Sequence, residues 1–254
     1  MVTAQTTATT AAEEALARST LYRFLSVAWC PPDDGLDELR TVPAVLTAVM
    51  AAAEGIGVVR GRELVESIAT TLTASDPAGL RAEYRRLFGH QISRDCPLHE
   101  TQYGAGHIFQ QAQQLADIAG FYLAFGLEVA EGAGERVDHL SLELEFLHAL
   151  AFRETHARLH AGEEEVSQLV EARQAFVRDH ISRWVPAFSG LVAARNDGLY
   201  RALAHLTQAV ITADAVSLGV TADGEAELTP PVSLDPEEET LPCGTDRCPL
   251  EPAL

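Results

Sequence analysis

Apolar residues recur at helical spacing along most of this chain, over residues 11–217. One such series is Leu199, Leu203, Leu206, Val210 and Ala213. Steps of three and four place these side chains on one face of a helix, which is typical of a stripe that faces a core. No stretch alternates polar and apolar residues as a half-buried strand would. The sequence therefore predicts an all-α fold, with residues 11–217 forming a single helical bundle domain.

Prolines, glycines and one aspartate predict where several helices begin and end. The first helix should bury Leu21, Phe24, Leu25 and Ala28 and stop at Pro31-Pro32, because proline lacks the backbone N–H. Asp76 is a typical cap, and Pro77 suits the first position of a helix that should run to Phe88. A further helix, expected to end at Gly126, carries a predicted core stripe of Ile108, Ala112, Leu115, Ala119 and Tyr122.

The two ends of the chain differ from this body. Residues 1–10 are expected to be a flexible N-terminus. After Gly219 the chain has half of its 12 prolines, together with nine acidic residues and one arginine. Such a composition buries too little apolar surface to fold alone, so residues 218–254 are predicted to be a disordered acidic tail, which contains Cys243 and Cys248.

The charge is strongly unbalanced. The 37 acidic residues face 18 basic ones, all of them arginine, for a net charge of -19. This argues against binding nucleic acid or an anionic membrane, both of which need cationic patches. The chain does not start with basic residues followed by an apolar run, and no stretch approaches the roughly 18 apolar residues of a membrane span. We therefore expect a cytoplasmic protein whose cysteines are thiols or ligands rather than disulfides.

The segment 135–147, Glu-Arg-Val-Asp-His-Leu-Ser-Leu-Glu-Leu-Glu-Phe-Leu, combines an apolar helical stripe with polar residues at its start. Asp138, His139 and Glu143 gather near the first turn of the expected helix. The structural interpretation is a helix cap at Asp138, and the functional one is a docking surface. A second segment, residues 176–188, repeats the Asp-His pair and ends in Trp-x-Pro-x-Phe, which favours the docking surface.

Signatures of enzymes are missing. The sequence has no Gly-x-x-x-x-Gly-Lys loop, no Gly-x-Ser-x-Gly elbow and no His-Glu-x-x-His. Glu145 and His148 have the spacing of a helical di-iron site, but such a site needs a second copy that the sequence lacks. The chain is predicted not to be an enzyme, with a helical metalloenzyme as a remote alternative.

Cysteines provide the alternative of a metal site. Cys96, His99, Cys243 and Cys248 would supply three thiolates and one imidazole, which suit zinc or an iron-sulfur cluster if the tail folds back onto the loop. A metal or cluster carrier is therefore the alternative function. The opposing interpretation is that Cys96 is an ordinary buried thiol.

Three motifs resemble the TorD/DmsD/NarJ family of cytoplasmic chaperones that mature molybdenum oxidoreductases. Tyr84-Arg-Arg-Leu-Phe88 is similar to the family's Tyr-x-x-Leu-Phe, segment 135–147 to its Glu-x-Pro-Asp-His-x-x-x-Glu-Leu-x-Phe, and segment 176–188 to its His-x-x-x-Trp-x-Pro-x-Phe. Val137 departs from the family's proline. Residues 96–103 resemble the version in chaperones that serve ethylbenzene dehydrogenase, dimethyl sulfide dehydrogenase or selenate reductase.

The resemblance implies an all-helical protein that binds an apo catalytic subunit, often through its twin-arginine leader, until cofactor insertion is complete. A leader joins two arginines to an apolar run, so its receptor needs carboxylates beside a hydrophobic groove. We expect Asp138, Glu100 and Glu143 to supply the carboxylates, and His139 to bind the client or orient Asp138. Tyr22, Tyr103, Phe146 and Trp184 are expected to line or support the groove. Both a monomer and a homodimer remain open.

Overall fold

The fold is all-α, as predicted. The computed structural model describes residues 2–31, 43–89, 95–103, 108–130 and 135–220. Within these ranges the only extended pairing is a single bridge between His99 and His139. The helices are α1 (Val2–Ala28), α3 (Pro43–Gly55), α4 (Gly61–Ala74), α5 (Pro77–Phe88), the 3-10 turn η1 (Glu100–Gln102), α6 (Ile108–Ala124), α7 (Leu140–His160), α8 (Glu163–Phe176), the π-helical turn η2 (Val177–Ile181), α9 (Ser182–Arg195) and α10 (Leu199–Ser217).

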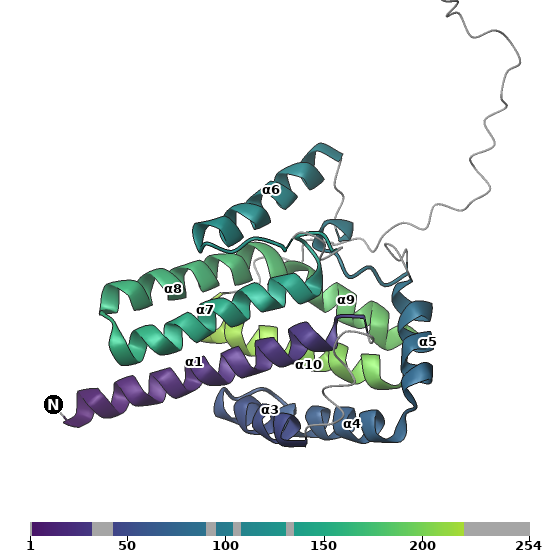
Figure 1. Cartoon of the computed structure of the whole chain (residues 1–254), viewed down its shortest axis with the longest axis horizontal. Coiled ribbons are helices and arrows are strands. Elements are labelled where there is room, and N and C mark those ends of the chain that lie inside the picture. Colours follow the sequence, from purple (N-terminus) through teal and green to yellow (C-terminus); the bar gives the residue numbers. More distant parts are fainter. Residues whose placement is uncertain (1, 32–42, 90–94, 104–107, 131–134, 221–254) are drawn as a thin grey trace, which may run out of the picture.

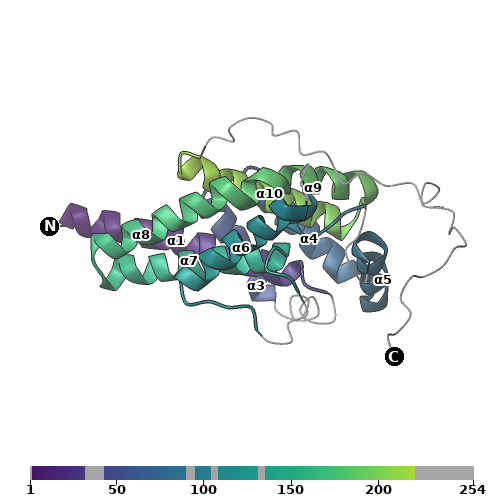
Figure 2. The same cartoon turned by 90° about the horizontal axis from the view of Figure 1, so that it is seen from above.

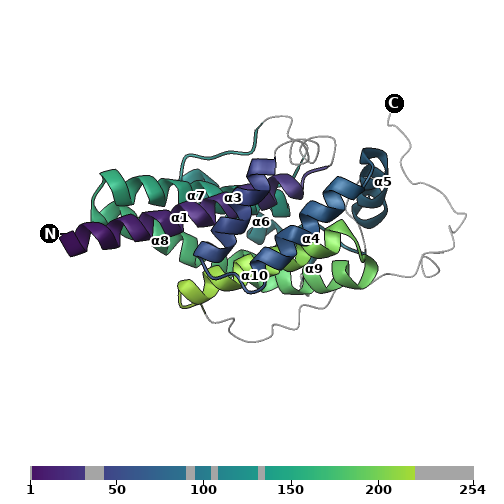
Figure 3. The same ribbon diagram turned by 90° about the horizontal axis from the view of Figure 1, so that it is seen from below.

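Helices α1, α7, α8, α9 and α10 form a central layer, with α6 on one side and α3 and α4 on the other. Helix α1 packs along α7, α7 along α8, and α10 along α9 (Figure 1). Helix α6 lies over α7 and α8 in the view from above (Figure 2). On the opposite side, α3 crosses α1 and α4 crosses α10 (Figure 3). The central helices therefore have partners on several sides, whereas α6 is peripheral.

Helix α1 confirms one expectation and corrects another. Leu21, Phe24, Leu25 and Ala28 are all buried, and the helix ends three residues before Pro31, as predicted. The helix already begins at Val2, within the segment expected to be flexible. Ala4 and Ala8 favour helix at this end, whereas its threonines do not.

The predicted ends of α5 and the predicted end of α6 are confirmed, but the predicted core stripe of α6 is less buried than expected. The side chain of Asp76 accepts hydrogen bonds from the backbone N–H groups of Ala78 and Gly79, at 3.0 and 2.9 Å, and α5 ends at Phe88. Helix α6 ends at Ala124, and Gly126 follows with a φ of 65°. Its predicted core stripe is only partly correct, because Ala112 is exposed and Leu115 half-buried on this peripheral helix.

A buried network of charges connects four helices. We call it the ion network and define it as Arg18, Tyr22, Glu154, Arg173 and Asp214. Asp214 accepts a hydrogen bond from the Tyr22 hydroxyl at 2.6 Å and forms ion pairs with Arg173 and, at 3.0 Å, with Arg18. Arg173 also pairs with Glu154 at 3.2 Å. Tyr22 therefore belongs to the core, where it does not line a client groove directly.

An aromatic cluster explains the motif Tyr84-x-x-Leu-Phe88. The rings of Trp29, Tyr84, Phe88, Phe188 and Tyr200 contact one another with centroid distances from 4.9 to 6.5 Å. The Trp29 indole N–H also donates to the Thr207 hydroxyl at 2.9 Å, so its polar atom is satisfied in the core. This motif thus joins α5 to α1, α9 and α10 rather than forming a surface.

Candidate functional site

The loop at residues 95–103 is fastened to the start of α7. The backbone N–H of Glu100 donates to the carbonyl of Asp138 at 3.0 Å, and the N–H of Leu140 donates to the carbonyl of Leu98 at 2.8 Å. These two bonds surround the bridge between His99 and His139. Two segments that the sequence analysis singled out separately are therefore one structural unit.

Asp138 is completely buried and works inside this unit. Its carboxylate accepts hydrogen bonds from the Thr101 hydroxyl at 2.8 Å and from the Arg136 guanidinium at 2.6 and 3.0 Å. Burial by itself raises the pKa of Asp138, but the hydrogen bonds from Arg136 and Thr101 lower it below its usual value. Asp138 is thus an ionised anchor for the loop, with its charge already compensated by Arg136.

His139, and not Asp138, caps α7. Its Nδ1 accepts a hydrogen bond from the backbone N–H of Ser141 at 3.2 Å and lies 2.7 Å from the Ser141 hydroxyl. Burial lowers the pKa of His139 to about 3, so the imidazole is neutral at pH 7. The predicted cap at Asp138 and the predicted bond from His139 to Asp138 are both wrong, because each side chain has a different backbone partner.

Three carboxyl groups meet behind this loop. We call Glu100, Asp138 and Glu143 the acid cluster. Glu143 accepts a hydrogen bond from the Trp184 indole at 3.1 Å, while Glu100 lies 3.1 Å from Nδ1 of His180. Burial raises the pKa of Glu143 well above its usual value, and the charge of Glu100 raises it further. The raised pKa favours the protonated form of Glu143, and its Oε1 is buried without a hydrogen-bond partner among the described residues.

The π-helical turn η2 positions His180 for this contact. It interrupts the course of α8 into α9, and π-turns of this kind widen a helix locally and often occur at functional sites. The Nε2 of His180 lies 3.4 Å from the carboxylate of Asp117 on α6. His180 thus connects the loop, through Glu100, with the helix that covers it. The sequence analysis noted the Asp-His pair here but predicted no role for His180.

The aromatic residues expected in a client groove are part of the core. Tyr103 stacks on Trp184 at a centroid distance of 5.1 Å, and its hydroxyl donates to the carbonyl of Pro97 at 2.7 Å. Phe146 contacts the ring of Phe176 at 4.8 Å. All eight predicted client residues are at most 5% exposed, namely Tyr22, Glu100, Tyr103, Asp138, His139, Glu143, Phe146 and Trp184. The expected open, carboxylate-lined groove at these positions is therefore wrong for this structure.

Beside the buried unit lies a hollow that opens to solvent, which we call the α1–α7 hollow. Its volume is about 280 Å³, and Glu135 and Ser141 of the motif segment contribute to its wall. The complete lining is Arg23, Ser26, Val27, Cys30, Pro31, Glu135, Ser141, Leu142 and Glu145. The sequence analysis did not select Glu135, although it is the first residue of the motif.

Two glutamates, Glu135 and Glu145, bring carboxylates to the wall of the α1–α7 hollow. Glu135 is about one-third exposed, and burial raises its pKa above the usual value. Its carboxylate lies 3.8 Å from Nε2 of His139 and 3.9 Å from Nε2 of His99. Glu145 pairs with Arg23 at 3.3 Å, and both side chains are more than half exposed. Exposed pairs of this kind are weak, so a cationic ligand can compete for Glu145.

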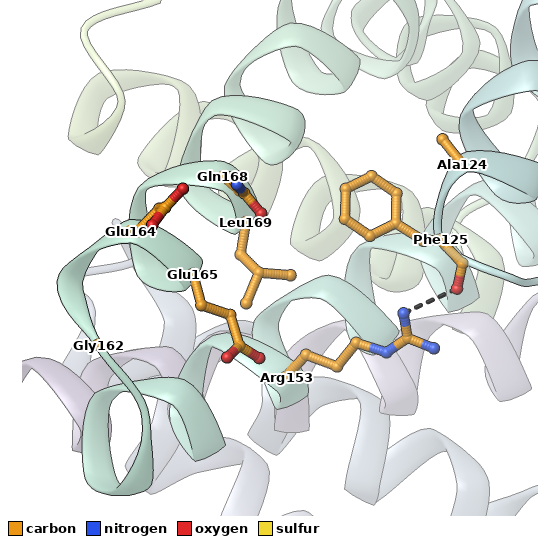
Figure 4. A pocket seen from close by; sticks show the side chains of 8 residues that line it. All are labelled: Ala124, Phe125, Arg153, Gly162, Glu164, Glu165, Gln168 and Leu169. Atoms are coloured by element: carbon orange, nitrogen blue, oxygen red, sulfur yellow. Dashed lines mark hydrogen bonds between the residues drawn. The ribbon is translucent and has the colours of Figure 1, made fainter.

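Two other hollows lie away from the motif segments. One, of about 670 Å³, is formed by the end of α6, α7 and the start of α8, where Phe125 and Leu169 line one part and Glu164 and Glu165 another (Figure 4). Arg153 donates to the carbonyl of Phe125 at its edge. The other, of about 580 Å³, is mostly apolar and lies between α4 and α10, with Val59 and Val216 strongly exposed.

The predicted metal site receives no support from its described half. Cys96 is fully buried, and burial raises its pKa to about 11, which disfavours the thiolate that a metal needs. Burial likewise lowers the pKa of His99. Cys243 and Cys248 lie outside the described residues. In the ranges that the structure covers, His, Cys, Asp and Glu side chains form no group of three or more that suits a metal ion.

The remote alternative of a metalloenzyme fares no better. Glu145 points to Arg23 at the surface, whereas Nδ1 of His148 lies 2.9 Å from the hydroxyl of Ser19. Each side chain thus has its own partner, and the two do not form a common metal site.

Among the helices that the structure describes, none is both long and apolar enough to cross a membrane.

Comparisons with known proteins agree with the motifs. The model of the family described as nitrate reductase delta subunit matches residues 60–189, slightly more than half of the chain. The chain is 34% identical over 95 residues to a protein named chaperone protein TorD from Photobacterium profundum, which is 37% of this chain and 43% of that protein. For the protein of the same name from Vibrio cholerae the identity is 33% over 104 residues, covering 41% and 44%.

A longer alignment covers a third relative. The perchlorate reductase assembly chaperone protein of Dechloromonas aromatica is 23% identical over 190 residues, which is 72% of this chain and 81% of that protein. The matches to the TorD proteins span less than half of their length. The finer resemblance to chaperones of particular dehydrogenases stays a prediction. The family match and these relatives show that the chain belongs to the nitrate reductase delta subunit family, the TorD/NarJ group whose motifs it carries.

Proposed function

We propose that this protein is a cytoplasmic chaperone, and not an enzyme, that holds the apo catalytic subunit of a molybdenum oxidoreductase until its cofactor is inserted. Two kinds of relatives support the chaperone role, since their printed names are chaperone protein TorD and perchlorate reductase assembly chaperone protein. The client is recognised through its twin-arginine leader or the adjoining surface of the mature subunit.

The α1–α7 hollow is the surface that we assign to the client. The observation that carries this assignment is that Glu135 and Glu145, the two glutamates of the motif segment 135–147 that line the hollow, are partly exposed, while Asp138, His139 and Glu143 of the same segment are buried. Val27, Pro31 and Leu142 supply apolar wall, and the two glutamates supply negative charge. Such a surface suits a segment that carries an arginine beside apolar residues.

The acid cluster and His139 contribute indirectly. They fasten the loop 95–103 to the start of α7, and this holds the backbone that carries Glu135 in place. Exposed ion pairs contribute at most about 1 kcal/mol each, so apolar burial must provide most of the affinity. The charges of Glu135 and Glu145 then determine which segments are accepted and how fast they associate.

A pull-down with a molybdoenzyme catalytic subunit, with and without its leader, tests the proposed function. The full chain should retain the apo subunit and release it after cofactor insertion. Binding only when the leader is present identifies the leader as the recognised part, and equal binding of both forms identifies the mature body. Failure to retain either form contradicts the proposal.

A double variant tests the assigned surface. Glu135→Gln with Glu145→Gln keeps the size of both side chains and removes both charges, so client affinity should fall while the fold is kept. The matched control is Glu164→Gln with Glu165→Gln, which removes two exposed charges at the hollow formed by the end of α6, α7 and the start of α8. Equal losses in both pairs would show that overall charge, and not the α1–α7 hollow, determines binding.

The alternative role as a metal or iron-sulfur carrier lacks a supporting observation. Of its four predicted ligands, Cys96 is buried as a thiol and Cys243 and Cys248 lie outside the described residues. Elemental analysis of anaerobically purified protein distinguishes the two roles. Stoichiometric zinc or iron that is lost in a Cys243→Ser, Cys248→Ser variant would favour the carrier.

A further inference from the structure

Three exposed arginines gather where α5 and α9 end. Arg85 and Arg86 lie in the last turn of α5, and Arg195 is the last residue of α9. The guanidinium of Arg86 reaches the backbone carbonyl of Arg195 at 3.5 Å, which places the two helix ends side by side. We call these three residues the arginine patch.

Some arginines pair with carboxylates and others donate to backbone carbonyls. Within the part of the chain that the structure describes, the ion-paired arginines are Arg18, Arg23, Arg60, Arg62, Arg136, Arg158, Arg173 and Arg178. The patch residues donate to the backbone carbonyls of Arg81, Arg195 and Leu191, as Arg153 and Arg183 do to carbonyls elsewhere. A carbonyl carries no net negative charge, so the patch places three positive charges together in a chain with a net charge of -19.

We infer that the acidic C-terminal segment of this same chain, residues 221–254, docks on the arginine patch. The segment holds nine acidic residues and one arginine, and the run Asp235-Pro-Glu-Glu-Glu239 concentrates four of those acids. Carboxylates pair well with guanidinium groups, often through two parallel hydrogen bonds. The segment carries dense negative charge and is tethered to the same chain as the patch. We therefore take it as the partner of the patch.

The length of the connection permits this contact. The patch lies near the start of α10, because Leu199, its first residue, comes only four residues after Arg195. Helix α10 has 19 residues and is about 28 Å long. From Val220 to Asp235 an extended chain spans up to about 50 Å, so the acidic run can return along α10 to the patch. Tethering also gives the run an effective concentration on the order of millimolar, at which weak ion pairs suffice.

The docked segment would neutralise the patch. The inference depends on charge and chain length alone and does not require the proposed chaperone function. An anionic molecule from solution would have to displace the segment before it could bind the patch.

The absence of lysine from the sequence provides a selective test. In the full chain, Arg85→Lys introduces a single ε-amine, which a zero-length carbodiimide reagent joins to a carboxylate in direct contact. Mass spectrometry should find position 85 joined to residues 235–239 of the same molecule. The yield should fall several-fold in high salt, because salt screens exposed charges.

Arg62→Lys is the matched control. Arg62 is exposed on α4 and bonds to Glu54 at 2.6 Å, so its replacement should couple to Glu54 and prove that the reagent works. Coupling to residues 235–239 should be several-fold weaker from position 62 than from position 85. Equal coupling from both positions overturns the inference, as do products that join position 85 only to nearby carboxylates. Products that join two chains would overturn the intramolecular assignment.

Discussion

The ion network and the acid cluster are both buried, but they solve the problem of burying charge in opposite ways. In the ion network, two carboxylates, Glu154 and Asp214, face two buried arginines, Arg18 and Arg173. In the acid cluster, three carboxyl groups face a single arginine, Arg136. The first region balances its charges, whereas the second reduces its charge by keeping a proton on Glu143.

This difference separates a fixed scaffold from a region whose charge depends on pH. Paired charges in the core join α1, α7, α8 and α10. The acid cluster and the neutral imidazole of His139 hold the loop at residues 95–103, and burial shifts the pKa values of Glu143 and His139 away from their usual values. Stability near the candidate site should therefore respond to pH.

The largest effect is expected in the ion network. Asp214→Asn leaves Arg18 and Arg173 buried with too little negative charge, and breaking a buried pair in this way costs about 3–5 kcal/mol of unfolding free energy. Denaturant unfolding measures the loss. Asp179→Asn is the matched control, since Asp179 is an exposed partner of Arg178 and should change stability little. A loss no larger than that of the control would mean that the network is not a scaffold.

His139 should give the next largest effect, seen at low pH. Its pKa is about 3 in the folded protein and 6.5 in the unfolded chain, so only the unfolded state binds a proton in between. Stability is therefore lost as pH falls below 6.5, by about 1.4 kcal/mol per unit or roughly 2–3 kcal/mol at pH 4.5.

The variant His139→Asn isolates this contribution, because asparagine can still cap α7 and does not titrate. Unfolding curves of both proteins between pH 7 and pH 4.5 should diverge as the pH falls, with the wild type losing more. Parallel curves would mean that His139 is protonated in the folded state and that its neutral capping role is wrong.

Glu143 should give a smaller effect on stability, with the opposite dependence on pH from that of His139. In the variant Glu143→Gln, glutamine imitates the protonated carboxyl group and keeps an acceptor for Trp184, so stability at pH 5 should change by no more than about 1 kcal/mol. As pH rises above 4.5 the unfolded carboxyl loses its proton while the folded one keeps it, and the wild type loses stability. Relative to the variant, this loss amounts to at most about 1.4 kcal/mol between pH 5 and pH 6.

The comparison of unfolding free energies at pH 5 and pH 6 provides the check. A variant that is strongly destabilised at pH 5 would show that the folded state needs an ionised Glu143, contrary to its raised pKa.

The smallest effect on stability is expected at the surface. Removing the pair between Arg23 and Glu145 by Glu145→Gln should change the free energy of unfolding by about 0.5 kcal/mol or less, because both side chains are more than half exposed. A loss comparable with that of Asp214→Asn would place Glu145 among the scaffold residues and remove it from the proposed client surface.

The sequence predicted the helices well because their signals are local. The stripe around Leu21 and Leu25, the cap at Asp76 and the stop at Gly126 each depend on a few neighbouring residues, and the structure confirms them. The start of α1 at Val2 was missed, since a Thr-rich beginning was taken as flexible although its alanines favour helix.

The candidate site was predicted less well because burial depends on contacts between distant segments. Asp138 and Glu143 have the residue types of a binding site, but their partners Thr101 and Trp184 are 37 and 41 residues away. No local spacing indicates that such partners bury both carboxyl groups. Glu135 is a motif residue that stays partly exposed, and its position as the first residue of the motif was the available signal.

The pairing of Arg18 with Asp214 could not be predicted from the sequence either. These residues come from the first and last helices, 196 positions apart, and each could have been a surface charge on its own helix. Only the packing of α1 against α10 brings them together.

The central claim is that the motif's buried carboxyl groups shape the protein while its exposed ones meet the client. Titration of a client catalytic subunit or its leader peptide against three proteins, each at pH 7, tests this most directly. We predict that Glu143→Gln binds like the wild type and that Glu135→Gln with Glu145→Gln binds markedly more weakly. Loss of binding in a folded Glu143→Gln variant, with unchanged binding in the surface variant, would contradict the account.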